Sequence, residues 1–328
     1  MKATKYLVLS LPIVIILSIL ITGCKKEKDE NYLPQGLSGK FLFLTYSWDN
    51  KRIYSVDADG KTLLMNVPSF CDNLGIVRWS PDGSKILFVT SGGDFYPPHT
   101  IVMNSDGTTQ REISPGDTNT YGDWSPDGKK IILVRLNESI VTLNADGSGI
   151  LPLPHGTSPK WSPDGTRIVF VNGGSVYKVN ADGSELDTLT SGMDPCWSLD
   201  GLQIYFLNST AIWSITLSDH STRKMADMPQ VQVCDLSWSP KRTQVLFFTK
   251  LDIQVMNLDG SKLIQLVNHS EPLYSSYFNC TCWFPDGTKV TYKSDDGGFY
   301  VINVDGSNPI RLNTNLSLDG TIMAVDWH

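Results

Sequence analysis

A five-residue pattern recurs along most of the chain and limits the folds that this sequence can adopt. Copies of Trp-Ser-Pro-Asp-Gly, strict at first and looser later, begin at Trp79, Trp124, Trp161, Trp197, Trp238 and Trp283. Successive tryptophans are 45, 37, 36, 41 and 45 residues apart. A period of about 40 to 50 residues with a turn motif in each unit indicates the blades of a β-propeller.

Each repeat contains enough strand-forming sequence for one four-stranded sheet. An apolar strand follows the Pro-Asp-Gly turn, as in residues 85–90, and a second strand ends in an Asn-x-Asp-Gly turn, as in 176–183. A shorter stretch such as 186–190 completes the unit. The 27 glycines and 18 prolines are spread along the chain and no long helical period occurs, so we predict an all-β protein.

The two ends of the chain complement each other. Residues 39–67 supply three strands of a unit with no tryptophan strand before them, whereas residues 323–327 supply a tryptophan strand with nothing after it. We therefore predict that residues 39–328 form a seven-bladed β-propeller of four-stranded antiparallel blades. Its last blade is closed by the C-terminal strand, which joins the three N-terminal strands and leaves only short sheet edges.

The repeated residues themselves have structural explanations. In the Pro-Asp-Gly turn, proline presets φ, the aspartate side chain caps the turn, and glycine adopts a positive φ. We expect the asparagines of the other turn to bond the backbone in the same way; these are Asn104, Asn144, Asn180, Asn257 and Asn303. The segment Asp57-Ala58-Asp59-Gly60 matches only the first positions of a calcium loop, so a structural turn is favoured there.

Seven tryptophans, counting Trp327, each close a strand at the same place in a unit. This regular placement favours packing between blades over a carbohydrate-binding stripe. Five cysteines follow Cys24, so at least one has no partner within the chain, and the pairing of the five is left open. They are Cys71, Cys196, Cys234, Cys280 and Cys282.

The N-terminus has the form of a secretory signal. Lys2 and Lys5 precede an apolar run over residues 6–21, which ends in Ile21-Thr22-Gly23-Cys24. This ending resembles the lipobox of bacterial lipoproteins. The resemblance implies removal of residues 1–23 as a signal peptide and a lipid on Cys24. The alternative is an uncleaved membrane anchor, but the run is shorter than the roughly 20 apolar residues of a membrane span.

Residues 24–38 then form the lipidated cysteine and a polar tether. The resemblance implies an outer membrane lipoprotein that faces the periplasm or is exposed at the cell surface, with the membrane as its first partner. Without residues 1–23 the chain has 25 Lys and Arg against 34 Asp and Glu, a net charge of −9. No basic stripe occurs beyond residue 30, which excludes a nucleic-acid partner.

Over about residues 39–328 the repeats resemble the TolB-type, or WD-like, propeller repeats of periplasmic TolB and of prolyl oligopeptidase-type enzymes. The chain departs from TolB in having seven units where TolB has six blades, and it shows no counterpart of the α/β domain that precedes TolB's propeller. The role of TolB is therefore not implied as a whole. The chain also contains no Gly-x-Ser-x-Gly elbow, so prolyl peptidase chemistry lacks its nucleophile.

Irregular loops should share the face opposite the repeated turns, because alternate turns of a four-stranded meander lie on opposite faces. We place these loops at residues 67–75, 91–99, 114–122, 152–159 and 268–279. Their amphipathic side chains suit a recognition surface, although they could equally cover the core. The candidate binding residues are Phe70, Phe95, Tyr96, His99, Tyr121, His155, Tyr274, Tyr277 and Phe278.

Two functions remain open from the sequence. The first is a monomeric binding or scaffolding module that presents this loop face to a protein or a glycan polymer of the envelope. The second is a carbohydrate-active lyase or hydrolase, since seven-bladed propellers of this general kind include oligogalacturonate lyases with histidines and a metal in the funnel. His99, His155 and His269 lie in loops of the expected face. We assign no catalytic residue, no metal site and no cofactor.

Overall fold

The computed structural model describes residues 39–46, 51–57, 60–67, 76–89, 100–114, 119–135, 137–228, 235–249, 251–270, 281–312 and 321–328. Contacts divide the chain into Met1–Glu30 and Asn31–His328, and all of the described residues belong to the second unit. The predicted signal peptide, Cys24 and the tether lie outside these ranges. Within them, no helix has the length and apolar character of a membrane span.

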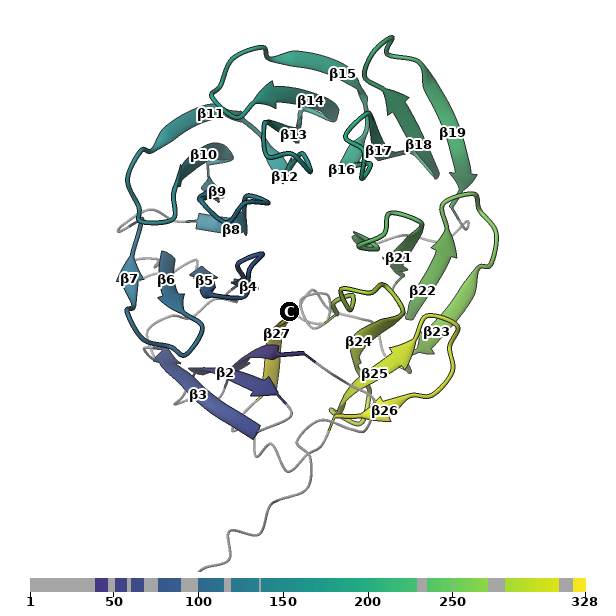
Figure 1. Ribbon diagram of the computed structural model, residues 1–328. Helices are drawn as coiled ribbons and strands as arrows, with labels where there is room; N and C mark the ends of the chain where they lie inside the picture. The colour runs from purple at the N-terminus through teal and green to yellow at the C-terminus, as the bar shows by residue number, and fades with distance from the viewer. Residues whose placement is uncertain are drawn as a thin grey trace, which may run out of the picture. The chain divides into compact units, whose positions relative to one another are not determined.

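The described residues form antiparallel sheets that follow one another around a ring (Figure 1), and we number these sheets as blades 1 to 7. Blade 1 contains β1 (Phe41–Tyr46), β2 (Lys51–Asp57), β3 (Gly60–Val67) and β27 (Thr321–Trp327). Blade 2 contains β4 (Ile76–Trp79), β5 (Lys85–Val89), β6 (Thr100–Asn104) and β7 (Arg111–Glu112). Blade 3 contains β8 (Asn119–Trp124), β9 (Lys130–Arg135), β10 (Ser139–Asn144) and β11 (Leu151–His155).

The remaining blades repeat this order of strands. Blade 4 contains β12 (Thr157–Trp161), β13 (Arg167–Asn172), β14 (Ser175–Asn180) and β15 (Asp187–Ser191). Blade 5 contains β16 (Met193–Trp197), β17 (Gln203–Asn208), β18 (Ala211–Thr216) and β19 (Thr222–Asp227). Blade 6 contains β20 (Asp235–Trp238), β21 (Gln244–Phe248), β22 (Asp252–Asn257) and β23 (Ile264–Asn268). Blade 7 contains β24 (Lys289–Lys293), β25 (Phe299–Asn303) and β26 (Ile310–Arg311), and its innermost position is a single bridge from Trp283 to Val290.

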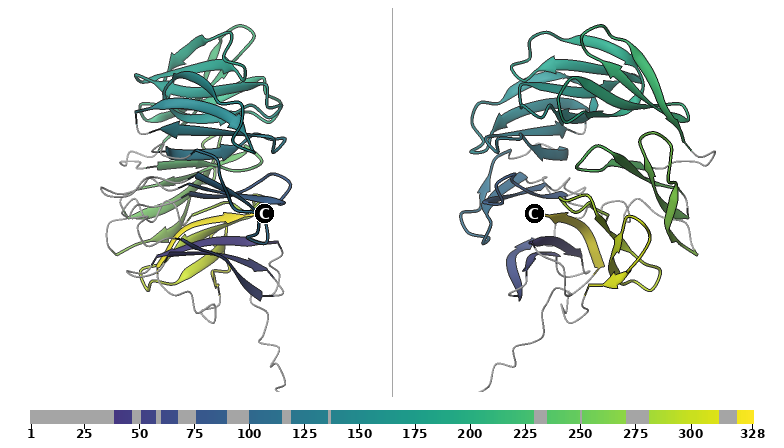
Figure 2. Two further views of the ribbon diagram at one scale, coloured as in Figure 1. Left: turned by 90° about the vertical axis from the view of Figure 1, so that its left-hand side faces the viewer. Right: turned by 45° about the vertical axis from the view of Figure 1, so that its right-hand side comes forward.

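Blade 1 is built from both ends of the chain, as the sequence predicts. Its strand order is β27-β1-β2-β3, and Phe41 pairs with Trp327. The pairing continues one residue further, because Lys40 donates its backbone N–H to His328 at 2.9 Å and accepts one in return at 3.0 Å. Figure 2 shows the yellow C-terminal strand beside the purple N-terminal strands. The C-terminal strand therefore closes the ring.

The core lies between the blades. Each of the seven buried apolar clusters of the described residues joins two neighbouring blades, including one that joins blade 7 to blade 1. Every repeat tryptophan belongs to the cluster that its blade shares with the preceding blade. The indole N–H of Trp197, for example, donates to the backbone oxygen of Lys160 at 3.0 Å. The predicted packing of the tryptophans between blades is confirmed.

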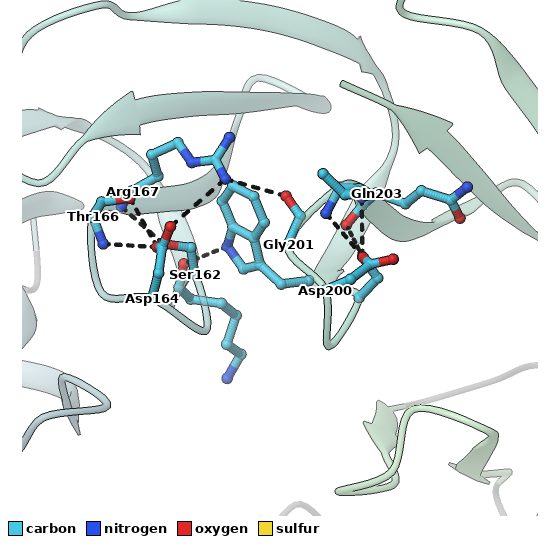
Figure 3. Close-up of polar contacts among 11 residues, drawn as sticks. Ser162, Asp164, Thr166, Arg167, Asp200, Gly201 and Gln203 are labelled. Atoms are coloured by element: carbon cyan, nitrogen blue, oxygen red, sulfur yellow. Dashed lines mark hydrogen bonds and ion pairs between the residues drawn. The ribbon is translucent and has the colours of Figure 1, made fainter. Parts of the chain in front are cut away.

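The Pro-Asp-Gly turns have a common hydrogen-bond network, which Figure 3 shows for blade 4. Ser162 donates its hydroxyl to Asp164 at 2.6 Å and accepts the backbone N–H of Arg167 at 2.9 Å, while Asp164 also accepts the N–H of Thr166 at 3.0 Å. The Arg167 guanidinium continues to the next blade, where it donates to the backbone oxygen of Gly201 at 3.1 Å. This contact ties two successive turns together.

The Asn-x-Asp-Gly turns differ from the expectation in one respect. In blade 3, Asn144 donates its side-chain amide to the hydroxyl of Ser148 at 3.0 Å, and Asp146 accepts the backbone N–H of Ser148 at 2.9 Å. The same amide-to-hydroxyl contact occurs at Asn104, Asn180, Asn257 and Asn303. The aspartate therefore makes the side-chain bond to the backbone, because it lies two residues before the N–H that it accepts.

Two of the predicted loops are strands over part of their length. Residues 152–159 were expected to be a loop, but β11 and β12 occupy them and only Gly156 lies between these strands. In the loop expected over 114–122, β8 already begins at Asn119. The sequence misleads here because Pro152, Pro154 and Pro159 are typical of loops, whereas the outer and inner strands of a blade have one edge without a partner strand and tolerate proline.

Candidate functional site

The residue immediately before each repeat tryptophan lies on the opposite side of its strand, because side chains alternate along a β-strand. These seven residues come from the innermost position of every blade and are Arg78, Asp123, Lys160, Cys196, Ser237, Cys282 and Asp326. The pKa of Arg78 on blade 2 is raised by charged groups on blades 1 and 3 and by Cys282 of blade 7. Side chains from at least four blades therefore approach one another at the central channel of the ring.

Arg78 and Asp326 connect the closing strand to blade 2. Asp326 accepts the backbone N–H of Trp79 at 2.7 Å. Desolvation raises the pKa of Asp326, although Arg78 opposes this effect. Desolvation also disfavours the charged form of Arg78, but the carboxylates of Asp326 and Asp123 outweigh it and raise the pKa of the guanidinium. The hydrogen bond from Trp79 to Asp326 thus links β27 to β4, with the opposite charge of Arg78 nearby in the channel.

Lys160 and Tyr121 form a second polar group further along the ring. The Lys160 ammonium donates to the Tyr121 hydroxyl at 2.9 Å, and this hydroxyl donates to Asp123 at 3.0 Å. Desolvation disfavours the Lys160 cation, but Tyr121 and Asp123 outweigh it, so its pKa is raised. Desolvation, and then the charge of Asp123, raises the pKa of Tyr121. Both shifts favour the protonated forms, the ammonium of Lys160 and the phenol of Tyr121.

A cavity of about 300 Å³ lies beside this group. It is lined by Thr120, Tyr121, Val134, Thr157, Ser158, Lys160, Asp194, Pro195, Leu236 and Trp238. These residues come from blades 3 to 6, and most lie on the innermost strands β8, β12, β16 and β20. Thr120 and Thr157 are near the starts of their strands, whereas the Pro-Asp-Gly turns follow the ends. The exposed lining residues Thr120 and Thr157 therefore lie toward the face opposite the repeated turns, which we call the loop face.

Two residues of the cavity have strained backbones. Ser158 has φ 51° and Asp194 has φ 50°, and they are the only non-glycine residues with positive φ inside the described strands. This conformation costs roughly 1–2 kcal/mol for an L-residue. The pairing of β12 and of β16 shifts register at these two positions. Such bulges re-aim side chains, and here both affected residues line the cavity.

Of the nine candidate binding residues, the described part of the chain includes Tyr121 and His155. Tyr121 lies within β8 and lines the cavity, so it is a residue of an innermost strand and not of a loop. His155 is the exposed last residue of the outermost strand β11, with Nδ1 3.2 Å from the backbone oxygen of Asn137. The fold does not bring these two side chains together. The other seven lie outside the described residues, and the binding role of the set stays a prediction.

Two of the three histidines in the metal hypothesis, His155 and His269, are described, and both lie on or next to the outermost strand of a blade, whereas the innermost strands line the channel. His155 ends the outermost strand of blade 3, and His269 follows the outermost strand of blade 6. His269 is buried, with Nδ1 2.6 Å from a carboxylate oxygen of Asp295. Hydrogen bonds from the Ser270 hydroxyl and backbone, and then from His269, lower the pKa of Asp295 to about 2. His99 and the calcium-like residues Ala58 and Asp59 lie outside the described residues.

Lys160, Ser158, Asp194 and Trp238 were missed by the sequence analysis. A signal existed for Lys160, because the residue before the tryptophan varies among the repeats while the turn that follows stays nearly constant. Cys196 and Cys282 occupy the same repeat position; Cys196 is a buried thiol, and the Cys282 sulfur lies 3.3 Å from the Thr291 hydroxyl. No such signal marks Ser158 or Asp194, since a bulge depends on the pairing between two strands.

Comparisons with solved structures support the fold. TolB of Acinetobacter baumannii is 15% identical, with a TM-score of 0.54 over 90% of this chain and 68% of that protein. A proposed 6-phosphogluconolactonase of Bacteroides uniformis is 14% identical, with a TM-score of 0.60 over 88% and 99%. Its counterpart in Bacteroides fragilis is 13% identical, with a TM-score of 0.56 over 92% and 99%. Identities this low show a shared propeller fold and nothing further.

Comparisons by sequence add no family. No family model matches the chain, and no curated protein matches it. The function is therefore argued from the chain's own residues.

Proposed function

We propose that this chain is an envelope-associated binding module, held at a membrane by a lipid on Cys24, whose loop face receives a protein or an envelope polymer. The observation that carries the proposal is the cavity of about 300 Å³, which four different blades line with polar and aromatic side chains. Rigid strands hold these side chains, and a concave site with a few convergent polar groups is typical of ligand recognition.

The likeness to TolB and the lipobox-like ending at Cys24 both fit a location in the envelope. The alternative is a carbohydrate-active enzyme with histidines and a metal in the funnel. It receives no support from His155 and His269, because both lie on or next to outermost strands. We therefore propose the binding module alone.

The binding face can be tested by photo-crosslinking in living cells. A photoreactive residue would replace Thr120 or Thr157 on the loop face, and Lys129 on the turn face as the exposed control. We expect covalent adducts from the loop-face positions only. Equal adducts from both faces, or adducts from the turn face alone, would contradict the proposal.

The anchor requires a separate experiment. Cells grown with labelled palmitate should incorporate the label into the intact chain and not into a Cys24→Ser variant, which should also leave the membrane fraction. Label retained by Cys24→Ser would show that the lipid is attached elsewhere or that the label is adventitious.

A further inference from the structure

We propose that the cavity lined by β8, β12, β16 and β20 binds a carboxylate carried by a ligand about one ring in size, with Lys160 as the cation that recognises it. This inference deepens the proposed function and rests on it. It names the chemistry of the ligand, which the fold and the comparisons leave open.

The first argument is the unused hydrogen-bonding capacity of Lys160. An ammonium has three N–H donors, and within the described residues its one hydrogen bond goes to Tyr121. No ion pair joins Lys160 to a carboxylate there. Asp123, the nearest compensating charge along the network, is itself engaged by the Tyr121 hydroxyl and by the backbone N–H of Trp124 at 2.9 Å. Lys160 therefore has donors left for an anionic ligand.

The other polar groups of the cavity add further donors. Thr157 and Ser158 carry hydroxyls, which can donate to a carboxylate oxygen, whereas the Thr120 hydroxyl already donates to the backbone oxygen of Val134 at 3.2 Å. Asp194 is the one acid among the lining residues, and desolvation raises its pKa, with Lys160 opposing. When protonated, Asp194 also donates. One cation with three further O–H donors, on Thr157, Ser158 and protonated Asp194, matches the several lone pairs of a carboxylate.

The strained backbone supports the same site. Both strained residues inside the described strands, Ser158 and Asp194, line this cavity. Positive φ turns their side chains away from the direction that a regular strand would give them. Strained residues of this kind cluster at ligand sites, where the surrounding structure holds them in place.

The apolar part of the lining suits the body of the ligand. Val134, Pro195, Leu236 and Trp238 supply apolar surface. Trp238 differs from the other repeat tryptophans in the acceptor of its indole N–H. Trp197 donates to the backbone oxygen of the residue just before the preceding tryptophan, whereas Trp238 donates to the backbone oxygen of Asp194 at 3.3 Å. Its acceptor is thus two residues nearer the loop face. Trp238 is also less buried than the other six repeat tryptophans, and its ring stacks on that of Tyr205 with the centroids 5.7 Å apart.

The size of the cavity limits the size of the ligand. A volume of about 300 Å³ is at the lower limit for small-ligand sites, so the body of the ligand is about one ring.

The test is isothermal titration calorimetry on the full-length chain purified in detergent micelles. The probes are two matched pairs, glucuronate with glucose and cyclohexanecarboxylate with cyclohexanol. We expect at least one acid to bind tenfold or more tightly than its neutral partner. Preference within the sugar pair would identify an acidic saccharide unit, and preference within the cyclohexane pair an apolar acid. If neither acid binds more tightly than its neutral partner, the proposal is wrong.

Variants locate the binding site. Lys160→Met should abolish the preference for the acid, Lys160→Arg should retain part of it, and the exposed Lys129→Met on the turn face should leave it unchanged. Thr157→Glu provides a variant that does not disturb the channel, because Thr157 is exposed at the mouth of the cavity. It should weaken acid binding at least tenfold by charge repulsion. Unchanged binding in both Lys160→Met and Thr157→Glu would overturn the proposal.

The crosslinking experiment separates this inference from the proposed function. Loop-face adducts without any preference for an acid would reject the carboxylate site and retain the binding module. Acid binding that depends on Lys160, without loop-face adducts, would retain the carboxylate site and reject the macromolecular partner.

Discussion

The serine that follows the repeat tryptophan is almost inaccessible to solvent wherever it occurs. Ser162 is 0% exposed, and Ser80, Ser125, Ser198 and Ser239 are also buried. In the regular turns its hydroxyl donates to the turn aspartate and accepts a backbone N–H from the residue five positions later. A hydroxyl is the smallest group that can do both in a buried space. In blade 7, Phe284 takes this position and packs against Phe41 and Trp327 at the closing interface.

Replacing Ser162 by alanine should lower the free energy of unfolding by about 1–3 kcal/mol, because the N–H of Arg167 loses a buried acceptor. Ser184→Ala is the matched control, since Ser184 also donates to an aspartate at 2.6 Å but is exposed. It should change the free energy by about 0.5 kcal/mol or less. Urea denaturation measures both values, and equal losses in the two variants would show that burial of the serine is unimportant.

At the scale of the element, blades 3 and 4 are joined by a single glycine. Gly156 donates its N–H to the backbone oxygen of Glu138 at 2.7 Å and connects β11 directly to β12. A Cβ at this position would lie 2.5 Å from both the Phe170 ring and the backbone oxygen of Val171. Gly192 connects blades 4 and 5 with the same close approach to Phe206. Glycine is needed here for space, since a short link presses the chain against the next strand.

Gly156→Ala should destabilise the protein by about 1–3 kcal/mol, because overpacking displaces Phe170 or the strand β13. Gly174→Ala is the control for backbone conformation alone. Gly174 has φ 75°, and a Cβ there would meet no atom within 4 Å, so its loss should be about 1 kcal/mol. The comparison uses the free energy of unfolding in urea. A larger loss for Gly174→Ala than for Gly156→Ala would contradict the steric explanation.

The aspartates of the repeated turns should also make the free energy of unfolding depend on pH. Hydrogen bonds from Ser80 and Ser162, and then from backbone N–H groups, lower the pKa of Asp82 and Asp164 to about 2. The unfolded chain has aspartate pKa values of about 3.9, so it binds more protons than the folded chain between these values. The stabilisation is present above about pH 4 and is lost as the pH falls toward 2. Asp326 acts in the opposite direction, because its pKa is raised.

Thermal melts between pH 6 and 2 measure this dependence. We expect the melting temperature to fall most steeply below pH 4. An Asp164→Asn variant should show a smaller fall than the intact chain. A melting temperature that does not change between pH 4 and 2 would contradict the role of the turn carboxylates.

At the scale of the whole molecule, closure of the ring depends on one strand. β27 supplies the innermost strand of blade 1, and Trp327 lies in the cluster that joins blades 7 and 1. The same strand contacts blade 2, since Asp326 accepts the N–H of Trp79 at 2.7 Å. Three blades therefore depend on the last eight residues. Without them, β1 would present an unpaired edge.

Deletion of residues 321–328 should abolish cooperative thermal unfolding, because it opens the interface between blades 7 and 1 and exposes Phe41. Circular dichroism melts and dye binding to exposed apolar surface report the loss. Asp326→Asn is the milder control, since an amide oxygen can still accept the Trp79 N–H. This variant should stay folded with reduced stability. A deleted chain that melts as cooperatively as the intact chain would show that closure is dispensable.

The sequence alone determined the all-β class, the seven blades, the closure by the C-terminal strand and the packing of the tryptophans. These features depend on patterns that are local along the chain, such as turn chemistry, alternation within a strand and a constant spacing of Trp-Ser-Pro-Asp-Gly. The complementary ends at residues 39–67 and 323–327 required only that strands be counted. Prolines at 152, 154 and 159 misled the local interpretation, because pairing within the blade overrides their preference for loops.

Only the tertiary structure decided where a ligand could bind. Tyr121, Lys160, Asp194 and Trp238 are roughly 40 residues apart, the length of one repeat, and they meet because each lies on the innermost strand of its blade. The strain at Asp194 arises from a bulge in the pairing of β16 with β17, which no single segment encodes. A repeat specifies how one blade folds. The cavity is a property of several blades arranged around one channel, and it exists only when the ring is assembled.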